Sequence, residues 1–365
     1  MKEITVNRSS EGIFNYQGWP TVTKDEHGTL YVACSGHRLA HICPFGKNLM
    51  YVSHDDGETW SSPVIINDTV MDDRDAGILS LGNEKFLLTY FDHPRDFYLK
   101  DKKRLAATFL DSRQELIEGV MKYWEKMDEA KNTFGSFVRL SDDGCKTWSD
   151  AIRVPISSPH GPTLLSNGKL LYLGKESYTE EYENAVYAFE SADGGRTWDY
   201  LSRVDFPDGC GANNIHEPYA VELPDGRILG ALRGQGDAVE HGFTIYFTFS
   251  EDGGRTWTHP TPSGICGSPP HMLVHSSGAI VLTYGRRKAP FGERARVSYD
   301  GGKTWGEEIV ISSDSPVADL GYPSSVELSD GSILTVYYQR YGNDAFTSIL
   351  GTRWRLDESK LTDGK

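Results

Sequence analysis

One short pattern, S-x-D-x-G-x-T-W, recurs along this sequence and constrains its fold more than any other feature. Regular copies occupy residues 53–60, 191–198, 250–257 and 298–305, and a fifth copy at 141–148 carries its glycine one place early, at Gly144. In such a box the carboxylate and hydroxyl groups can hydrogen-bond the backbone of their own turn, glycine supplies a positive φ, and tryptophan packs between neighbouring sheets. We interpret the box residues as structural and expect neither catalysis nor calcium binding there.

A second repeat, in which a polar turn joins two short apolar strands, accompanies the boxes. Its turns, with the three clear copies first, contain Gly168, Gly226, Gly331, Gly28, Gly82 and Gly278. The two repeats together predict six units of four short strands, each an inner hairpin followed by an outer strand pair whose turn is the box. The sequence therefore predicts an all-β fold, a six-bladed β-propeller of one domain over residues 1–365.

The sixth unit has no box, and its apolar pattern ends at Leu356, short of a fourth strand. Residues 3–6 can supply that strand from the other end of the chain. We predict that they close the ring, which would leave no exposed sheet edge.

One unit is longer than the others. The boxes begin at residues 53, 141, 191, 250 and 298, so the first interval is 88 residues and the others are 48 to 59. The excess lies in residues 101–130, where these apolar residues recur at helical spacing among charges: Leu105, Phe109, Leu116, Val120 and Trp124. We predict a helical hairpin inserted in blade two, at about residues 99–133. This hairpin is a candidate cap for a functional site or a candidate contact between subunits of an oligomer.

Composition narrows the classes of partner. Thirty-seven basic and 52 acidic side chains give a formal net charge of −15, which argues against nucleic-acid and anionic-membrane binding. No apolar run approaches the roughly 18 residues of a membrane span, and the polar N-terminus does not resemble a secretory signal. The five cysteines are scattered without C-x-x-C spacing, which predicts neither a disulfide framework nor a zinc knuckle. We expect a cytoplasmic protein.

In a propeller, the segments just before each inner hairpin meet at one mouth of the central channel. Here these channel-mouth segments are residues 16–20, 72–77, 159–162, 215–218, 268–271 and 319–323. They contain more Arg, Asp, Glu, His and Tyr than turns require, so we expect the functional site among them.

The boxes and the channel-mouth residues resemble those of the sialidase (neuraminidase) superfamily, in its BNR-repeat branch. The matching positions besides the boxes are residues 216–218, Arg233, residues 286–287 and residues 321–323. The resemblance covers the chain except for the helical insertion. It implies a retaining exo-glycosidase that releases a terminal acidic sugar, sialic acid or a related one, from glycans and needs no cofactor.

By motif position, Tyr322 resembles the family's nucleophile and Glu217 the base that activates it. A substrate with a carboxylate at its anomeric carbon repels a carboxylate nucleophile, whereas a neutral phenol that loses its proton during attack does not. The alternative for Tyr322 is an aromatic residue lining the channel, and for Glu217 a salt bridge to a channel arginine.

The family binds the substrate carboxylate with three arginines, because planar guanidinium groups can form bidentate hydrogen bonds to it. Arg233 matches the second, and Arg286 or Arg287 matches the third, with Arg287 preferred. The first is missing, because the corresponding stretch, residues 17–20, reads Gln-Gly-Trp-Pro. The candidates for substrate contact around this gap are Gln17, Trp19, Arg38 and Arg74.

The family's acid/base aspartate is also absent, since residues 34–50 contain no carboxylate. His41 stands in this stretch and can exchange protons near neutral pH. Asp75 is the other candidate and is preferred, because the adjacent Asp72 and Asp73 are expected to raise its pKa. The alternative for His41 is a loop histidine without a role in catalysis, and the alternative for Asp75 is a solvated acidic turn.

Three further histidines, His160, His216 and His271, come from different blades and can meet at the channel. None has paired ligand spacing, so we do not predict a metal site and favour hydrogen bonds to sugar hydroxyls. Trp19, Tyr178 and Tyr338 are candidates for stacking on a sugar ring.

Two rivals to the sialidase hypothesis remain: a propeller glycosidase or lyase for a uronic, keto-deoxy or deoxy sugar, and a non-catalytic carbohydrate-binding propeller.

Overall fold

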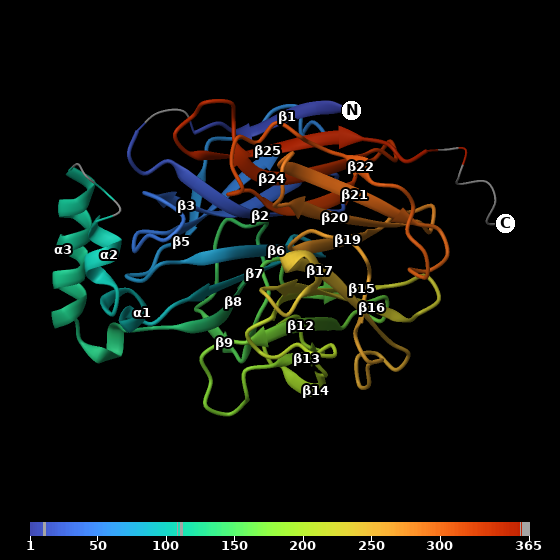
Figure 1. The fold of residues 1–365 in the computed structure, drawn as a ribbon, viewed down its shortest axis with the longest axis horizontal. Helices are drawn as coiled ribbons and strands as arrows, with labels where there is room; N and C mark the ends of the chain where they lie inside the picture. Colours follow the sequence, from blue (N-terminus) through green and yellow to red (C-terminus); the bar gives the residue numbers. More distant parts are fainter. Residues whose placement is uncertain (10–11, 108, 110–111, 358, 360–365) are drawn as a thin grey trace.

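The computed structural model describes residues 1–9, 12–107, 109, 112–357 and 359. Their strands form six antiparallel sheets, one for each predicted unit, and the predicted six-bladed propeller is confirmed (Figure 1). Blade one contains β2 (Tyr16–Lys24), β3 (Leu30–Arg38), β4 (Lys47–Ser53) and β5 (Val64–Asn67). Blade two contains β6 (Arg74–Gly82), β7 (Lys85–Asp92), β8 (Gly135–Ser141) and β9 (Ile152–Val154). Blade three contains β10 (Ile156–Ser157), β11 (Thr163–Leu164), β12 (Leu170–Glu176), β13 (Val186–Ser191) and β14 (Asp199–Val204).

The second half of the chain repeats this arrangement. Blade four contains β15 (Ile215–Glu222), β16 (Ile228–Gln235), β17 (Phe243–Ser250) and β18 (Thr261–Pro262), with the short helix η2 (Glu240–Gly242) before β17. Blade five contains β19 (Pro270–Val274), β20 (Ile280–Arg286), β21 (Gly292–Ser298) and β22 (Ile309–Val310). Blade six contains β23 (Gly321–Glu327), β24 (Ile333–Arg340) and β25 (Thr347–Trp354), and its fourth strand is β1 (Lys2–Asn7).

The predicted ring closure is confirmed. β1 pairs antiparallel with β25, with Ile4 opposite Gly351, and Figure 1 shows the blue first strand beside the red last one. Ile4 and Val6 are each 6% exposed and belong to the apolar cluster between blades six and one. The N-terminal strand thus joins the last sheet to the body of the fold.

The boxes have the structural role that their composition predicts. In the copy between β17 and β18, Asp252 Oδ1 accepts a hydrogen bond from the Thr256 amide at 2.8 Å, and Trp257 Nε1 donates to the Gly254 carbonyl at 3.1 Å. In the irregular fifth copy, Cys145 takes the position of the usual glycine with φ +66°. The boxes and the hairpin turns lie at the same end of the strands, opposite the channel-mouth segments, because each sheet is antiparallel.

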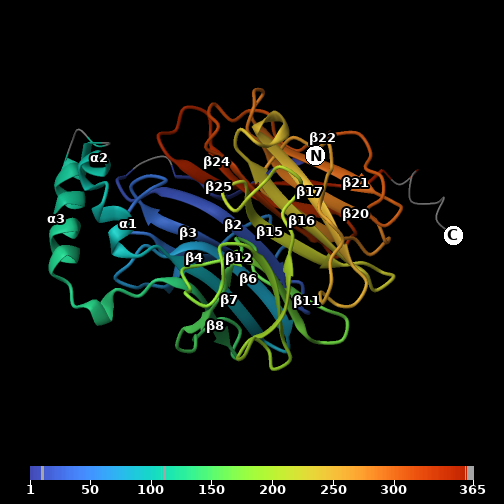
Figure 2. The same cartoon turned by 60° about the horizontal axis from the view of Figure 1, so that its bottom comes forward.

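The helical insertion is present but differs in detail from the prediction. It comprises α1 (Arg95–Leu99), α2 (Lys102–Ala107), α3 (Ser112–Lys126) and the short helix η1 (Glu129–Lys131), so it is more than a hairpin and begins earlier. Both views place α1 to α3 at one side of the propeller, beside blades one and two (Figure 1 and Figure 2).

The buried face of α3 is centred on Trp124, which is fully buried and donates from Nε1 to the Val70 carbonyl at 3.1 Å. Leu116, which was expected on the apolar face, is 38% exposed, and the neighbouring Ile117 is buried instead. Ile117 packs with Leu39 and other residues that follow β3, so the insertion is fixed to the loop after β3. Among the described residues, no helix is long and apolar enough to cross a membrane.

Candidate active site

The same backbone irregularity occurs in the innermost strands of four blades, and it positions the site. In each strand two residues oppose a single residue of the neighbouring strand: 19–20 oppose Cys34, 75–76 oppose Tyr90, 217–218 oppose Leu232, and 322–323 oppose Tyr337. The first residue of each bulge has a left-handed backbone, with φ of +56° at Trp19, +48° at Asp75, +40° at Glu217 and +52° at Tyr322. Bulges of this kind re-aim side chains. Here they turn one side chain from each of four blades toward the channel mouth.

Tyr322 and Glu217 meet at this mouth although they are 105 residues apart. The Tyr322 hydroxyl donates to Glu217 Oε1 at 2.5 Å, which lies within the distance needed for direct proton transfer. Arg233 Nη1 donates both to Tyr322 Oη, at 3.1 Å, and to Glu217 Oε2. One guanidinium group therefore holds the phenol and the carboxylate together.

The electrostatics of this triad keep the two acidic groups in different protonation states. Burial would raise the pKa of Glu217, but the charge of Arg233 and the hydrogen bonds from Tyr322 and Arg233 outweigh it and lower the pKa. Burial and the Glu217 charge raise the pKa of Tyr322 well above its ordinary value. Tyr322 is thus a neutral phenol beside an ionised carboxylate that can accept its proton.

Arg287 approaches the triad from the end of blade five. Its guanidinium carbon lies 5.9 Å from the centroid of the Tyr322 ring, and Nε donates to Ser268 Oγ at 3.2 Å. The adjacent Arg286, the other candidate, pairs with Glu308 at 3.1 Å. The structure therefore brings Arg287 to the site, whereas Arg286 is held by a carboxylate of its own blade.

Asp75 lies on the other side of the triad and carries a perturbed carboxyl group. Burial raises the pKa of Asp75 to about 7, although the Arg74 charge opposes this rise and the Glu217 charge adds to it. Among the described residues, Oδ1 is buried without a hydrogen-bond partner. Of the two neighbours expected to raise this pKa, Asp72 is a minor cause and Asp73 is not among the causes. Asp72 is ion-paired with Arg38 and Arg74.

A cavity of about 810 Å³ opens beside Asp75 and Glu217. Aromatic side chains line one part of it, and polar side chains of blades three and four line another. Its lining includes Phe91, His93, Phe97, Tyr178, Lys175, Glu176, Asn184, Asn213 and His216. Its size fits a sugar-sized ligand.

Two residues of blade one that were predicted to contact substrate are enclosed by other side chains. Gln17 is 5% exposed, and its amide is occupied by Ser9 and Tyr51. Trp19 is 1% exposed, and the guanidinium carbons of Arg74 and Arg38 lie 4.3 and 4.9 Å from its ring centroid. Residues distant in the sequence enclose both side chains, and their contact with substrate stays a prediction.

The two arginines around the gap are largely occupied as well. Arg38 is fully buried and donates to Asp72 from both terminal nitrogens. Arg74 is 5% exposed and donates from Nη1 to Asp72 and to the His41 carbonyl. Both guanidinium groups thus have protein partners, and substrate contact by Arg38 or Arg74 stays a prediction.

His41 is held in a cluster that the sequence did not reveal. Its Nδ1 lies 3.0 Å from Asp319 Oδ1 and 3.0 Å from Tyr16 Oη, and Tyr338 also donates to Asp319 at 3.1 Å. Burial lowers the pKa of His41, and the Asp319 carboxylate counteracts this effect. Asp319 opens the last channel-mouth segment, so its position was the signal that could have found it. Tyr338 is fully buried and offers no stacking face.

The three histidines separate into two groups. His216 lines the 810 Å³ cavity, and its Nδ1 lies 3.4 Å from Lys175 Nζ. His160 and His271 lie deeper, with ring centroids 4.9 Å apart, and line a separate channel cavity of about 290 Å³. Burial lowers the pKa of His160 to about 4. Both are at most 5% exposed and lie outside the lining of the 810 Å³ cavity, and their contact with a sugar stays a prediction.

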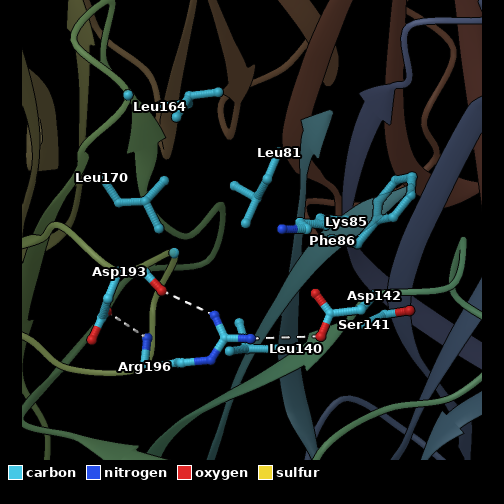
Figure 3. A pocket seen from close by; sticks show the side chains of 12 residues that line it. Leu81, Lys85, Phe86, Leu140, Ser141, Asp142, Leu164, Leu170, Asp193 and Arg196 are labelled. Carbon is cyan, nitrogen blue, oxygen red and sulfur yellow. Dashed lines mark hydrogen bonds and ion pairs between the residues drawn. The ribbon is translucent and has the colours of Figure 1, made fainter. Parts of the chain in front are cut away.

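Another cavity, of about 310 Å³, lies between blades two and three (Figure 3). Apart from Lys85, its polar side chains come from boxes, and Arg196 pairs there with Asp142 at 3.5 Å. It lies at the box end of the strands, so it is separate from the channel-mouth site.

Six blades with this site at the channel mouth define a propeller with a glycosidase-like fold. The chain belongs to the BNR repeat-like domain family, whose model matches residues 120–336. A BNR/Asp-box repeat model also matches residues 51–62, which contain the first box. The resemblance identified from the boxes and channel-mouth residues is thereby confirmed. No curated protein matches the sequence significantly.

Solved structures share this architecture at low sequence identity. A protein of unknown function from Dyadobacter fermentans is 22% identical, with a TM-score of 0.78 over 98% of each chain. The Ruminococcus gnavus intramolecular trans-sialidase, in complex with oseltamivir carboxylate, is 16% identical, with a TM-score of 0.63 over 96% of each chain. A Penicillium chrysogenum α-L-arabinanase complexed with arabinobiose is 16% identical, with a TM-score of 0.64 over 96% of this chain and 98% of the other. The propeller is thus shared by glycosidases with more than one specificity.

Proposed function

We propose that the protein is a retaining exo-glycosidase of the sialidase type, which releases a terminal acidic sugar from a glycan. The observation that carries the proposal is the 2.5 Å hydrogen bond from the Tyr322 hydroxyl to Glu217, with Arg233 bonded to both groups. A neutral phenol paired with an ionised carboxylate suits attack on an anomeric carbon that bears a carboxylate.

In the first step, Tyr322 Oη forms a bond to the anomeric carbon while its proton passes to Glu217. The bond to the leaving oxygen breaks, and Asp75 donates its proton to that oxygen. In the second step, Asp75 takes a proton from water, the water oxygen displaces Tyr322, and Glu217 returns the proton to the phenolate. Two displacements at one carbon retain its configuration.

Arg233 and Arg287 are the groups proposed to bind the substrate carboxylate, because both lie next to Tyr322 and neither is among the lining residues of the cavity beside Asp75. The first of the three sialidase arginines, which this chain lacks, corresponds to Gly18, and a side chain built there would meet the Tyr338 ring at 3.5 Å. Neither Arg38 nor Arg74 replaces it, since both are bonded to Asp72. The two arginines that are present support an acidic sugar in general. Because the other is missing, uronic and keto-deoxy sugars stay beside sialic acid as substrates to be tested.

A panel of activated aryl glycosides tests the proposal, with the α-sialoside, uronides, a keto-deoxy glycoside and neutral deoxy glycosides as members. We expect cleavage of an acidic member of the panel. NMR of the released sugar should show that the configuration at the anomeric carbon is retained. Tyr322→Phe should lower kcat by about 10² or more, because the nucleophilic oxygen is lost. Tyr299→Phe, at an exposed tyrosine, is the matched control and should behave as the wild type. Cleavage of no member, or full activity in Tyr322→Phe, would refute the proposal.

A further inference from the structure

The proposed mechanism does not use the aromatic side chains that line the 810 Å³ cavity. Phe97, on α1 of the insertion, stacks on His93 with ring centroids 3.9 Å apart and planes 15° from parallel. His93 Nδ1 is hydrogen-bonded to the Tyr178 hydroxyl from blade three. Phe97, His93 and Tyr178 therefore form one continuous unit, here termed the aromatic wall.

The aromatic wall presents apolar surface to solvent inside a cavity. Phe97 is 42% exposed and Tyr178 is 38% exposed, and both line the cavity that also contains Asp75 and Glu217. Lys175, Asn184 and other polar residues line other parts of the same cavity. An aromatic face with hydrogen-bonding groups nearby suits a sugar ring, which has apolar C–H faces and a rim of hydroxyls.

Contacts of helix α1, which carries Phe97, hold the aromatic wall in place beside the candidate active site. Tyr98, next to Phe97 on α1, is 1% exposed and donates its hydroxyl to the buried Asp72. Arg95, at the start of α1, donates to the Met127 carbonyl at 2.8 Å. Because α1 is anchored on both sides, the Phe97 ring is held in position before a ligand arrives, which lowers the entropic cost of binding.

We propose that the aromatic wall is a subsite for the leaving-group sugar, contributed in part by the helical insertion. The inference rests on the proposed function. Asp75, which is to protonate the leaving oxygen, lines this cavity, whereas Tyr322, Arg233 and Arg287 are not among its lining residues. The acidic sugar is bound at the arginines, so the sugar attached to the departing oxygen extends from Asp75 along the wall.

Two substrates with the same acidic sugar test the subsite: an oligosaccharide and the corresponding glycosyl fluoride, whose leaving group has no ring to stack. Phe97→Ala should lower kcat/KM on the oligosaccharide about three- to tenfold. It should leave kcat/KM on the fluoride within about twofold, because no wall contact is lost. Tyr178→Ala should show the same selectivity. Tyr123→Ala, at a 47% exposed tyrosine on α3 away from the cavity, is the matched control and should change neither value.

Equal losses on both substrates would place the acidic sugar itself against the wall and overturn the proposal, as would no loss on either. A direct binding measurement distinguishes failure of the subsite proposal from failure of the proposed function. Lactose is the probe, and its binding to the inactive Tyr322→Phe protein is followed by saturation-transfer NMR. We expect a signal that Phe97→Ala removes in the same background. If the wild type cleaves no glycoside, this measurement alone decides, and a lactose signal unaffected by Phe97→Ala overturns the subsite.

Discussion

Asp75, Glu217 and Tyr322 each have a backbone conformation that L-residues rarely adopt. A left-handed conformation costs roughly 1–2 kcal/mol for a residue with a side chain. The rest of the sheet must offset this cost, and strained residues that persist are concentrated at functional sites. The equivalent position in blade one is Trp19, which occupies its bulge with a buried ring and not with a reactive group. The same bulge therefore carries the proposed acid, base and nucleophile in three blades and a packing residue in the fourth.

The opposed pKa shifts of Asp75 and Glu217 predict the pH dependence of activity. Burial raises the pKa of Asp75 to about 7, so the acid is protonated below this pH and activity should fall as the pH rises through it. The pKa of Glu217 is lowered, so the base stays ionised down to pH values below its ordinary range. A profile of kcat/KM against pH should therefore be bell-shaped, with its upper limb near pH 7.

Substitution of each candidate acid, Asp75 and His41, distinguishes between them. Asp75→Asn should remove the upper limb and cost about 10² to 10⁴ on a natural linkage, with a much smaller loss on an activated aryl glycoside. His41→Gln serves as the comparison, because His41 is bonded to Asp319 and Tyr16. If His41→Gln shows the selective loss and Asp75→Asn loses equally on both substrates, the acid is His41.

At the scale of elements, what the sequence could predict depended on how local each signal was. Boxes and hairpin turns contain their own hydrogen-bond partners, so their pattern predicted the blades. Tyr322, Glu217 and Arg233 follow from short motifs at the ends of strands. The burial of Gln17 and Arg38 could not be predicted, because their partners Tyr51 and Asp72 each lie 34 residues further along the chain.

Helix α1 shows the opposite case, in which a local signal was present but weak. It follows Pro94 and spans only Arg95–Leu99, with Tyr98 as its buried residue, so it has no apolar period to detect. A proline just before a helix is a usual start signal, yet five residues are too few for a pattern. For this reason the contribution of the insertion to the cavity emerged only from the structure.

The separation of boxes from the channel mouth predicts that box variants affect stability without affecting catalysis. In Asp193→Ala, the backbone amides of Arg196 and Thr197 lose their acceptor, Asp193 Oδ1, at 3.0 and 2.9 Å. We expect Tm to fall by about 2 to 4 °C, while kcat/KM stays within about twofold of the wild type. The exposed Asp205→Ala, outside any box, is the control for loss of one carboxylate. A large loss of kcat/KM at unchanged Tm in Asp193→Ala would contradict a purely structural box.

At the scale of the whole molecule, the propeller depends on joining the two ends of the chain. Each blade packs on its neighbours through apolar clusters, and the cluster between blades six and one contains Ile4, Val6, Trp19 and Tyr322. The same cluster that closes the ring therefore supports the nucleophile of the proposed mechanism.

Removal of residues 1–8 tests whether the ring depends on this closure. The truncated chain loses β1, so β25 becomes an unpaired edge, and the apolar contacts of Ile4 and Val6 are lost. We expect the free energy of unfolding to fall on the order of 1–3 kcal/mol, with a Tm several degrees lower. An exposed edge strand also favours pairing between molecules, so light scattering should detect self-association that the full chain does not show. Glu3→Ala, on the exposed face of β1, keeps the strand and should keep Tm. An unchanged Tm in the truncated protein would show that the ring does not depend on β1.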